Sequence, residues 1–549
     1  MPTLAQAWID SAKGRGGDTA LIDAQSGPLS AHRALAVAIA FAKKMQCLSP
    51  EQNIGVLMPS SAGGVLANMA TLLSGKTIVN LNYTSNAVAF ASAVEQADIH
   101  TIYSSKKFIQ KLAERGIDFS ETLSQVKVIY LEELKQTISP FTLISTLLCV
   151  KVLPAWMLKR LYTKQQSNTA TAAILFSSGS EGSPKGVMLS HRNFMANLKQ
   201  IADVLNMDDK DVVMASLPLF HAFGLTVTQF MPLIEGLPMV CHPDPTDVLG
   251  ISKAIASNRV TFLCGTSTFL RLYCRNAKIH PLMLESLKHV VAGAERLQPR
   301  VREAFKLKFN KDILEGYGAT ETTPVASVNL PDALDTHYWK VQLGGRPGTV
   351  GMPLPGTSFK IVAPNTLEEL ATGDEGMILI GGAQVMQGYL NNSELSDQAI
   401  RHIGDARWYV TGDKGSLDED GFLTIVDRYS RFAKLGGEMI SLTAVEQLAG
   451  KALNALANHN TLEKLATGEE QEAQVMAVNI HDDKKGEKIV LLSEAPISLT
   501  DLKREMLHQG CNSLTIPAKV VTVEVLPKLG SGKADFASAK KLASDQPHD

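Results

Sequence analysis

The feature that most constrains the fold is an alternation of short apolar runs with helix-length segments along the first half of the chain. The apolar runs lie at residues 53–58, 172–176, 212–216, 260–264 and 289–292. Runs of this length, separated by helical segments, are typical of parallel strands buried between layers of helices. We therefore predict an α/β fold for this part of the chain.

The composition and the periodicity of the sequence change at about residue 344. From there to residue 425 glycine and proline are dense and the helical periodicity fades, which predicts a smaller β-rich subdomain. Further on, a helical pattern near 499–509 and an apolar run at 519–526 predict a compact α+β unit. We expect a large N-terminal domain, 1–427, made of two layered α/β subdomains and the β-rich subdomain at about 344–425, followed by a small C-terminal domain, 428–549.

Composition excludes several classes of protein. The 549 residues are 45% hydrophobic and 20% charged, which favours a large folded core over disorder. A formal net charge of −2 offers no basic surface for nucleic acid. The six cysteines have no metal-ligand or CxxC spacing, and the N-terminus lacks a basic start followed by an apolar run. We therefore expect a cytoplasmic protein with reduced thiols and no signal peptide; the sequence gives no indication of its oligomeric state.

The longest apolar stretch spans residues 141–160. It is interrupted by Lys151 and closed by Lys159 and Arg160, so it is too short and too broken for a transmembrane span. A packed, buried helix is the favoured interpretation. The alternative is a peripheral segment with basic flanks that lies on a membrane surface.

A segment suited to phosphate follows the apolar run that ends at Phe176. Its glycines let successive backbone N–H groups converge on an anion, its hydroxyls donate further hydrogen bonds, and a lysine adds positive charge. The segment is neither a Walker A loop nor a Rossmann fingerprint, because it matches neither GxxxxGK(S/T) nor GxGxxG. The candidate phosphate-binding residues are Ser177, Ser178, Gly179, Ser180, Gly182 and Lys185.

This segment resembles the phosphate loop of the adenylate-forming superfamily, which includes acyl-CoA synthetases, adenylation domains of peptide synthetases, and luciferases. The usual threonine of that loop is Glu181 here, and this variant resembles the branch of acyl–acyl carrier protein synthetases. The resemblance implies ATP and Mg²⁺ as cofactors and an acyl-adenylate as the intermediate.

A second motif of the superfamily is matched by residues 315–322. The resemblance implies that Tyr317 stacks on adenine, that Thr320 donates to the α-phosphate, and that Glu321 holds Mg²⁺. These roles suit the residue types, since an aromatic ring offers a stacking face and Mg²⁺ prefers carboxylate and phosphate oxygens. The remaining residues expected around the nucleotide are Glu315, Gly316, Gly318 and Ala319 of the same segment and Gly293, Ala294 and Glu295 of another.

Four further residues take roles from the resemblance. Asp413 is expected to accept hydrogen bonds from the ribose hydroxyls, and Arg428 to reach the ribose from a hinge. His221 is expected at the mouth of the acyl pocket, and Lys533 as the catalytic lysine on a glycine-rich loop. The resemblance further implies that the small C-terminal domain, which carries Lys533, is mobile and rotates between the two half-reactions about a hinge at Arg428 and Ser430. This hinge departs from the usual pattern, because Ser430 stands where Asp or Lys is usual.

The resemblance also predicts the substrates. It implies activation of a medium- or long-chain fatty acid and transfer of the acyl group to the phosphopantetheine thiol of acyl carrier protein. A fatty acyl-CoA synthetase that uses coenzyme A is the nearest alternative. A catalytically silent lipid- or nucleotide-binding relative is a third, and it would lack at least one of Lys185, Glu321, Asp413 and Lys533, all of which are present.

Overall fold

The computed structural model describes residues 1–24, 26–177, 184–435, 438–459, 474–482, 486–528 and 534–545. The chain forms two compact units. The larger unit reaches from the N-terminus to Thr411 and includes Ser416–Thr424, and the smaller contains Gly412–Gly415 and the chain from Ile425 onward. The domain boundary between residues 427 and 428, and the mobility of the C-terminal domain, stay predictions.

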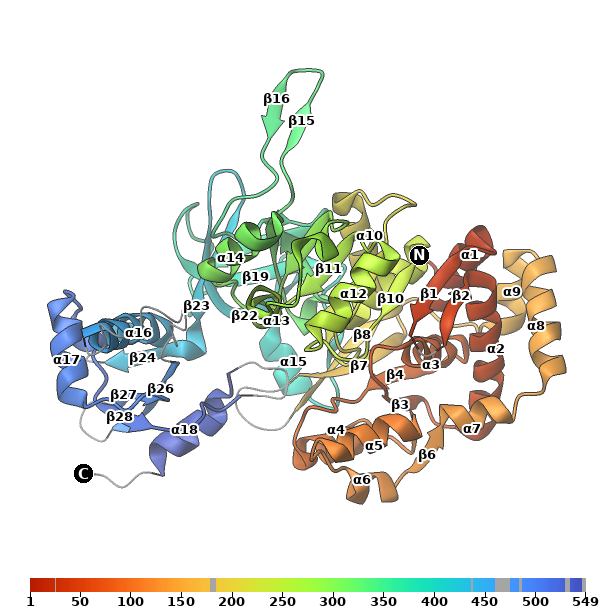
Figure 1. Cartoon of the computed structure of the whole chain (residues 1–549), viewed down its shortest axis with the longest axis horizontal. Helices are drawn as coiled ribbons and strands as arrows, with labels where there is room; N and C mark the ends of the chain where they lie inside the picture. Colours follow the sequence, from red (N-terminus) through yellow and green to blue (C-terminus); the bar gives the residue numbers. More distant parts are fainter. Residues whose placement is uncertain are drawn as a thin grey trace. The chain divides into compact units, whose positions relative to one another are not determined.

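The first large sheet of the larger unit has nine strands in the order β17-β14-β13-β12-β11-β9-β10-β1-β2. Figure 1 labels β1, β2, β10 and β11 of this sheet. The six strands from β13 to β1 are parallel, and the strands at both edges are antiparallel. Their bounds are β1 Thr19–Asp23, β2 Gly27–Ser30, β9 Val213–Ala215, β10 Met239–Cys241, β11 Phe262–Gly265, β12 His289–Ala292, β13 Ile313–Gly318, β14 Val325–Val328 and β17 Met352–Pro353.

The second large sheet has seven strands in the order β20-β8-β7-β4-β3-β5-β6. The strands from β7 to β6 are parallel, whereas β8 and β20 are antiparallel to their neighbours. The bounds are β3 Asn53–Leu57, β4 Thr77–Asn80, β5 Thr101–Ser104, β6 Lys127–Tyr130, β7 Thr171–Ser177, β8 Lys185–Ser190 and β20 Gly388–Tyr389. All five predicted apolar runs are strands of these two sheets, so the prediction of an α/β fold is confirmed.

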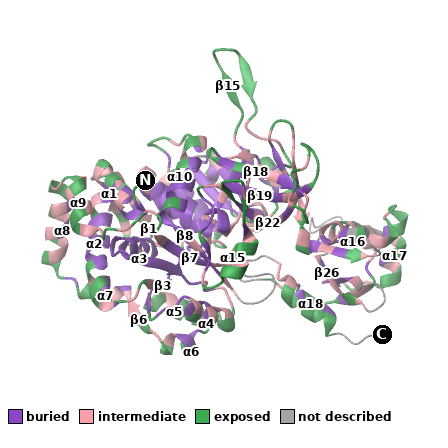
Figure 2. Cartoon of the chain, turned by 180° about the vertical axis from the view of Figure 1, so that it is seen from behind, coloured by how far each residue is buried: buried purple, intermediate pink, exposed green. Residues whose placement is uncertain are grey.

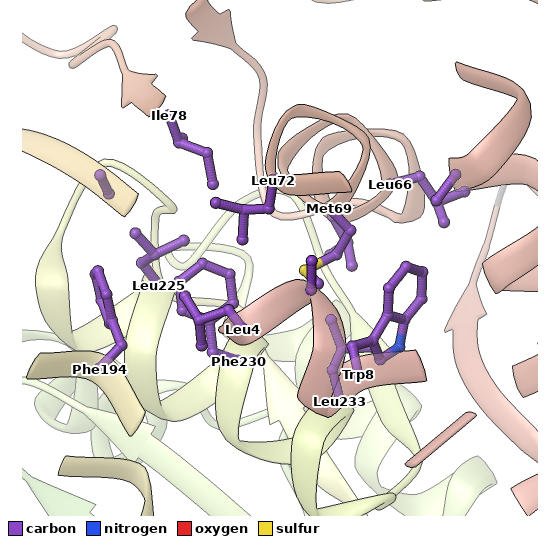
Figure 3. Packing of buried hydrophobic residues seen from close by; sticks show 14 of the residues in the cluster. Leu4, Trp8, Leu66, Met69, Leu72, Ile78, Phe194, Leu225, Phe230 and Leu233 are labelled. Carbon is purple, nitrogen blue, oxygen red and sulfur yellow. The ribbon is translucent and has the colours of Figure 1, made fainter. Parts of the chain in front are cut away.

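Helices pack against these sheets and form the main hydrophobic core. Helix α1 (Leu4–Arg15) begins at a capping box, in which Thr3 and Gln6 bind each other's backbone N–H groups. Its Trp8 is buried, and Figure 3 shows it close to Leu66 of α3 and Leu233 of α11. The other helices of the unit, apart from α8 and α9, are α2 Ala31–Leu48, α3 Ala62–Leu73, α4 Ala87–Gln96, α5 Lys106–Glu114, α6 Ser120–Ser124, α7 Leu131–Gln136, α10 His191–Leu205, the π-helix Gly224–Phe230, α11 Met231–Glu235, α12 Val248–Asn258, α13 Ser267–Arg275, α14 Pro299–Phe309 and α15 Ser393–Ala399.

The glycine-rich region is β-rich, as predicted. It contains a five-stranded sheet in the order β18-β19-β22-β21, with β23 paired to β22. Two strands of the region, β17 and β20, instead extend the edges of the two large sheets. An exposed hairpin of β15 (Ala333–Asp335) and β16 (Lys340–Gln342) projects from the larger unit (Figure 1). The sheet strands are β18 Thr357–Val362, β19 Gly376–Gly382, β21 Ile400–Ile403, β22 Ala406–Leu417 and β23 Leu423–Arg428.

The smaller unit is a compact α+β fold, which confirms that part of the predicted fold class. Buried Arg431 donates hydrogen bonds to the carbonyl of Ala477 (2.7 Å) and to the carboxylate of Glu446 (2.6 Å), and its guanidinium lies 3.8 Å from the ring centroid of Phe536. This one side chain therefore joins three elements of the unit. The elements are β24 Phe432–Leu435, β25 Glu438–Ser441, α16 Leu442–His459, β26 Val475–Asp482, β27 Gly486–Ser493, α17 Leu499–His508, β28 Lys519–Thr522 and α18 Phe536–Ser544.

The long apolar stretch forms two helices, α8 (Pro140–Val152) and α9 (Ala155–Tyr162). They are not buried as the favoured interpretation predicted, because only Thr146 and Val150 of α8 and Leu158 of α9 are fully covered. Figure 2 shows both helices mostly in the colours of exposed and intermediate residues. In the described part of the chain, no helix has the length and apolarity needed to cross a bilayer.

Candidate functional site

The predicted phosphate segment connects the antiparallel strands β7 and β8. Ser177 and Lys185 face each other at the open end of this pair, and the Ser177 hydroxyl donates to the carbonyl of Lys185 at 3.5 Å. The structure therefore places the first and last predicted phosphate contacts side by side. Ser178, Gly179, Ser180 and Gly182, which lie between them in the chain, fall outside the described residues.

Three side chains from distant parts of the sequence meet beside this strand pair. The two-residue strand β20 pairs with β8, with Tyr389 opposite Val187. The Tyr389 hydroxyl donates to Glu321 Oε1 at 2.8 Å, and the Lys185 ammonium lies 6.0 Å from the centroid of the Tyr389 ring. The structure thus brings together two predicted site residues, Lys185 and Glu321, through a third residue.

Tyr389 was not predicted from the sequence. Burial, followed by the negative charge of Glu321, raises the pKa of the Tyr389 hydroxyl well above its usual range. The hydroxyl therefore stays protonated and remains a donor to the carboxylate. The only sequence signal is an aromatic residue after Gly388 in a glycine-rich region, and nothing in that signal names Glu321 as its partner.

A tight turn holds Glu321. Residues Thr320–Thr322 form a 3₁₀ turn directly after β13, and the Thr322 hydroxyl accepts from the backbone N–H of Ala319 at 3.0 Å. The Thr323 hydroxyl donates to the carbonyl of Gln384 at 2.6 Å. These contacts fix the backbone on both sides of the carboxylate. Gly318, just before the turn, is required there, because a Cβ would lie 1.7 Å from the carbonyl oxygen of Pro324.

The predicted adenine segments lie at the carboxyl ends of neighbouring parallel strands. Residues Gly293, Ala294 and Glu295 follow β12, and Glu315 and Gly316 belong to β13, with Ala292 paired to Glu315. Ligands of open α/β sheets usually bind beyond this edge. A Cβ on Gly293 would come within 3.3 Å of the Phe223 ring, so the backbone approaches that ring closely.

Two carboxylates of these segments bind groups of the chain itself. Glu295 accepts hydrogen bonds from the backbone N–H of Thr268 and, at 3.2 Å, from its hydroxyl. Glu315 forms an ion pair with Arg302 of α14. These contacts stabilise the ends of the two strands. Tyr317, two residues after Glu315, is partly exposed at the end of β13.

The predicted acyl-pocket residue, His221, lies among aromatic side chains. Its ring centroid is 4.6 Å from that of Phe220, which in turn makes an edge contact of 4.8 Å with Tyr83. The buried π-helix Gly224–Phe230 begins three residues later. π-Helical turns are rare and occur frequently at functional sites.

The predicted ribose-binding residues contact each other in the smaller unit. Arg428 Nε lies 3.0 Å from Asp413 Oδ1, and the Asp413 side chain is buried whereas that of Arg428 is mostly exposed. Ser430, the predicted hinge residue, lies in the 3₁₀ turn Tyr429–Arg431 that follows. The predicted catalytic residue Lys533 lies outside the described residues.

Glu321 is the candidate metal ligand. Within the described segments no group of three or more His, Cys, Asp and Glu side chains is arranged to hold a metal ion. Magnesium in phosphate-transferring sites is usually bound by one or two carboxylates together with substrate phosphate oxygens. A single buried carboxylate beside a phosphate-suited strand pair fits that donor set and does not fit an all-protein metal cage.

Comparison with known proteins relates this site to a family. The model of the AMP-binding enzymes matches residues 9–390. The long-chain-fatty-acid–CoA ligase of Salmonella typhimurium is 29% identical over 367 residues, which make up 66% of this chain and 60% of that protein. The chain therefore spans less than two thirds of that relative's length. The long-chain-fatty-acid–CoA ligase of Bacillus subtilis is 26% identical, over 97% of this chain and 93% of that protein.

Solved structures share the fold over nearly the whole chain. The ATP-bound MatB from Rhodopseudomonas palustris superposes with a TM-score of 0.77 at 21% identity, covering 98% of this chain and 99% of that one. MenE from Bacillus subtilis, in complex with its acyl-adenylate intermediate, superposes with a TM-score of 0.74 at 22% identity, covering 97% of both chains. The family match includes Lys185, Glu321 and Tyr389. On these grounds the chain belongs to the family of AMP-binding enzymes.

Proposed function

We propose that this protein is an AMP-forming acid–thiol ligase that activates a fatty acid with ATP and transfers the acyl group to a thiol. The observation that carries the proposal is the cluster of Lys185, Tyr389 and Glu321 beside the β7–β8 pair, in a chain of the AMP-binding family. Relatives named long-chain-fatty-acid–CoA ligases support the choice of acid.

The first half-reaction joins two anions. A carboxylate oxygen attacks the α-phosphorus of ATP, the bond from that phosphorus to the pyrophosphate oxygen breaks, and acyl-AMP and pyrophosphate form. Such a step needs positive charge and oriented donors around the phosphates. We assign Lys185 to the phosphates and Thr320 to the α-phosphate. Glu321 would hold Mg²⁺, which supplies positive charge on the pyrophosphate side.

The other residues position the reactants. We assign the adenine to the strand ends at Gly293 and Tyr317, and the ribose to Asp413 and Arg428. His221 would orient the carboxylate of the acid. Lys533 would stabilise the negative charge that builds between the carboxylate and the α-phosphate, and the thiol then attacks the acyl carbon while AMP leaves.

Coenzyme A is the acceptor that we propose first. The names of the relatives favour it over acyl carrier protein, which the resemblance of residues 177–186 predicted. Acyl carrier protein remains the second candidate because of that resemblance. The two acceptors present the same phosphopantetheine thiol, so the adenylation chemistry is common to both.

Fatty-acid-dependent exchange between ATP and pyrophosphate tests the activation step. We expect exchange with a long-chain fatty acid, and a loss of about 100-fold in Glu321→Gln, because the neutral amide binds Mg²⁺ poorly. The matched control is Glu394→Gln, an exposed residue of α15, which should leave exchange unchanged. Absence of exchange with every fatty acid would support the silent alternative instead.

A direct comparison of acceptors tests the second step. Purified enzyme is given the same fatty acid with either coenzyme A or holo-acyl carrier protein, and the acyl thioester is measured in each case. We expect faster transfer to coenzyme A. Transfer to acyl carrier protein alone would reverse the assignment of the acceptor and leave the proposed activation step intact.

A further inference from the structure

Helices α8 and α9 present apolar side chains to solvent in a regular pattern. Phe141, Ile144, Leu148 and Val152 follow one another at intervals of three, four and four residues, so they lie on one face of α8. Each of these side chains is between 60% and 80% exposed. The opposite face carries Thr146 and Val150, which are buried. The α8 face, defined by the four exposed residues, is thus an apolar stripe that lies mostly in solvent.

The α8 face is held in place by contacts on its other side. Lys13 of α1 donates to the carbonyls of Val150 (2.8 Å) and Lys151 (3.0 Å), at the C-terminal end of α8. Lys159 of α9 binds Asp10 of α1 at 2.6 Å. In both Figure 1 and Figure 2 the two helices lie at the edge of the larger unit, outside α1 and α2. The stripe is therefore a preformed surface.

The charged residues of the segment that forms α8 and α9 are all basic. From Pro140 to Lys164 the sequence contains no Asp or Glu and four basic residues, Lys151, Lys159, Arg160 and Lys164. Three of these, all except Lys159, are exposed. Trp156 of α9, which is 65% exposed, adds an aromatic residue of the type enriched where membranes meet water.

These features favour a lipid surface over the other candidate occupants. A second copy of the chain meeting this face in a symmetric contact would bring like charges against each other, since both partners use the same patch. A transmembrane role does not fit, because α8 has 13 residues and a span needs about 20. An apolar helix face with basic flanks and no acidic residue is suited to lie in the interface of an anionic bilayer.

We propose that the α8 face docks on an anionic lipid surface. Phe141, Ile144, Leu148 and Val152 enter the boundary between headgroups and acyl chains, with Trp156 at the same level. Lys151, Arg160 and Lys164 bind lipid phosphates. The proposal stands independently of the reaction that the protein catalyses.

Vesicle sedimentation tests the proposal. The full chain is mixed with vesicles of phosphatidylcholine containing roughly 30 mol% phosphatidylglycerol, and with vesicles of phosphatidylcholine alone. We expect binding to the anionic vesicles that weakens as salt rises. The double variant Ile144→Glu/Leu148→Glu should bind at least about tenfold more weakly, because charges replace apolar contacts with the bilayer.

The controls separate docking from misfolding and self-association. Both substituted side chains are already in water, so the thermal-unfolding midpoint of the double variant should match that of the wild type. Leu307→Glu, at an 86% exposed apolar position of α14, should leave vesicle binding unchanged. Failure of the wild type to bind anionic vesicles would overturn the proposal, as would equal binding by the double variant. A wild-type dimer that the double variant abolishes, without vesicle binding, would instead identify the α8 face as a contact between copies.

Discussion

Tyr389 reaches Glu321 because a strand of only two residues pairs with β8. Register places its side chain beside the end of the β7–β8 pair, where the hydroxyl meets the carboxylate and the ring faces the ammonium of Lys185. A buried carboxylate that keeps one fixed donor is held in one orientation. We therefore infer that Tyr389 acts as a positioning residue for Glu321.

Removing the Tyr389 hydroxyl should weaken the site without changing the fold. In Tyr389→Phe, Glu321 loses its donor, and we expect a 10- to 100-fold fall (about 1.5–3 kcal/mol) in exchange activity at limiting Mg²⁺. A large part of the loss should be recovered at high Mg²⁺, since the defect lies in the orientation of the proposed metal ligand. The measurement is the Mg²⁺ dependence of ATP–pyrophosphate exchange.

Tyr103→Phe is the matched control. It also removes a buried tyrosine hydroxyl, one that is hydrogen-bonded to Ser49 at 2.9 Å in another part of the larger unit. We expect its Mg²⁺ dependence to equal that of the wild type. If both variants shift the Mg²⁺ requirement equally, Tyr389 has no specific role at Glu321.

Motifs in the sequence identified Lys185 and Glu321, because each belongs to a local segment whose residue types suit phosphate or Mg²⁺. Tyr389 could not be identified in this way. Its role depends on the pairing of β20 with β8, a contact between residues about 200 positions apart in the chain, for which the local sequence gives no signal.

At the scale of elements, a buried histidine links the start of α10 to α1. His191 Nδ1 accepts from the backbone N–H of Leu4 at 3.3 Å, and among the described residues the buried Nε2 has no hydrogen-bond partner. Burial lowers the pKa of His191 to about 4. Protonation would place a proton on the nitrogen that now accepts from Leu4, so the charged form breaks this contact.

The stability of the larger unit should therefore fall in acid. Because the pKa of His191 is lower in the folded than in the unfolded chain, its contribution is fully present above pH 6.5 and is lost as the pH falls towards 4. The loss is on the order of 3 kcal/mol. In His191→Gln, which cannot be protonated, the decrease in unfolding free energy between pH 7 and pH 4 should be smaller by that amount, as measured by urea unfolding.

An exposed histidine provides the comparison for this effect. His100, whose side chain is 67% exposed, should show no such change when replaced in His100→Gln. The assignment is tested by how the unfolding free energy changes between pH 7 and pH 4. A loss of stability in His191→Gln that is equal at both pH values therefore neither supports nor contradicts it. An unchanged slope would contradict the assignment.

The strands predicted from apolar runs, such as β3 and β12, match the structure closely, because a buried parallel strand is apolar along its whole length. The strands β17 and β20, with two residues each, were not predicted, because their partners define them. For α8 the apolar composition was recognised but its environment was not. The spacing of apolar residues is the same for a helix face that packs inside the protein and for one that is exposed at its surface, so periodicity cannot distinguish the two.

At the scale of the whole molecule, the residues assigned to the metal, the phosphates and the ribose are distributed over both compact units. Lys185 and Glu321 belong to the larger unit, while Asp413 belongs to the smaller. Domain rotation between half-reactions, implied by the family resemblance, would bring Lys533 to the site for adenylation and remove it for thiol attack. The described residues do not include Lys533, so its role stays a prediction.

Separate assays of the two half-reactions test that prediction. We expect Lys533→Ala to lower adenylate formation by at least about 100-fold, because the lysine would offset the charge that develops between the two reacting anions. Transfer from supplied acyl-adenylate to the thiol should change little. Lys503→Ala, at an exposed position of α17, is the control and should affect neither step. An equal loss of both half-reactions would contradict the assignment.

The stripe on α8 has a consequence for how the reaction would be measured. A long-chain acid dissolves mainly in bilayers. An enzyme docked through α8 would therefore encounter this substrate by diffusion within the plane of the membrane. Its rate would then follow the mole fraction of acid in the lipid, and adding inert lipid at constant total acid would slow it. The rate of the double variant Ile144→Glu/Leu148→Glu would no longer depend on the amount of inert lipid, whereas its rate with acid dissolved in water would equal that of the wild type.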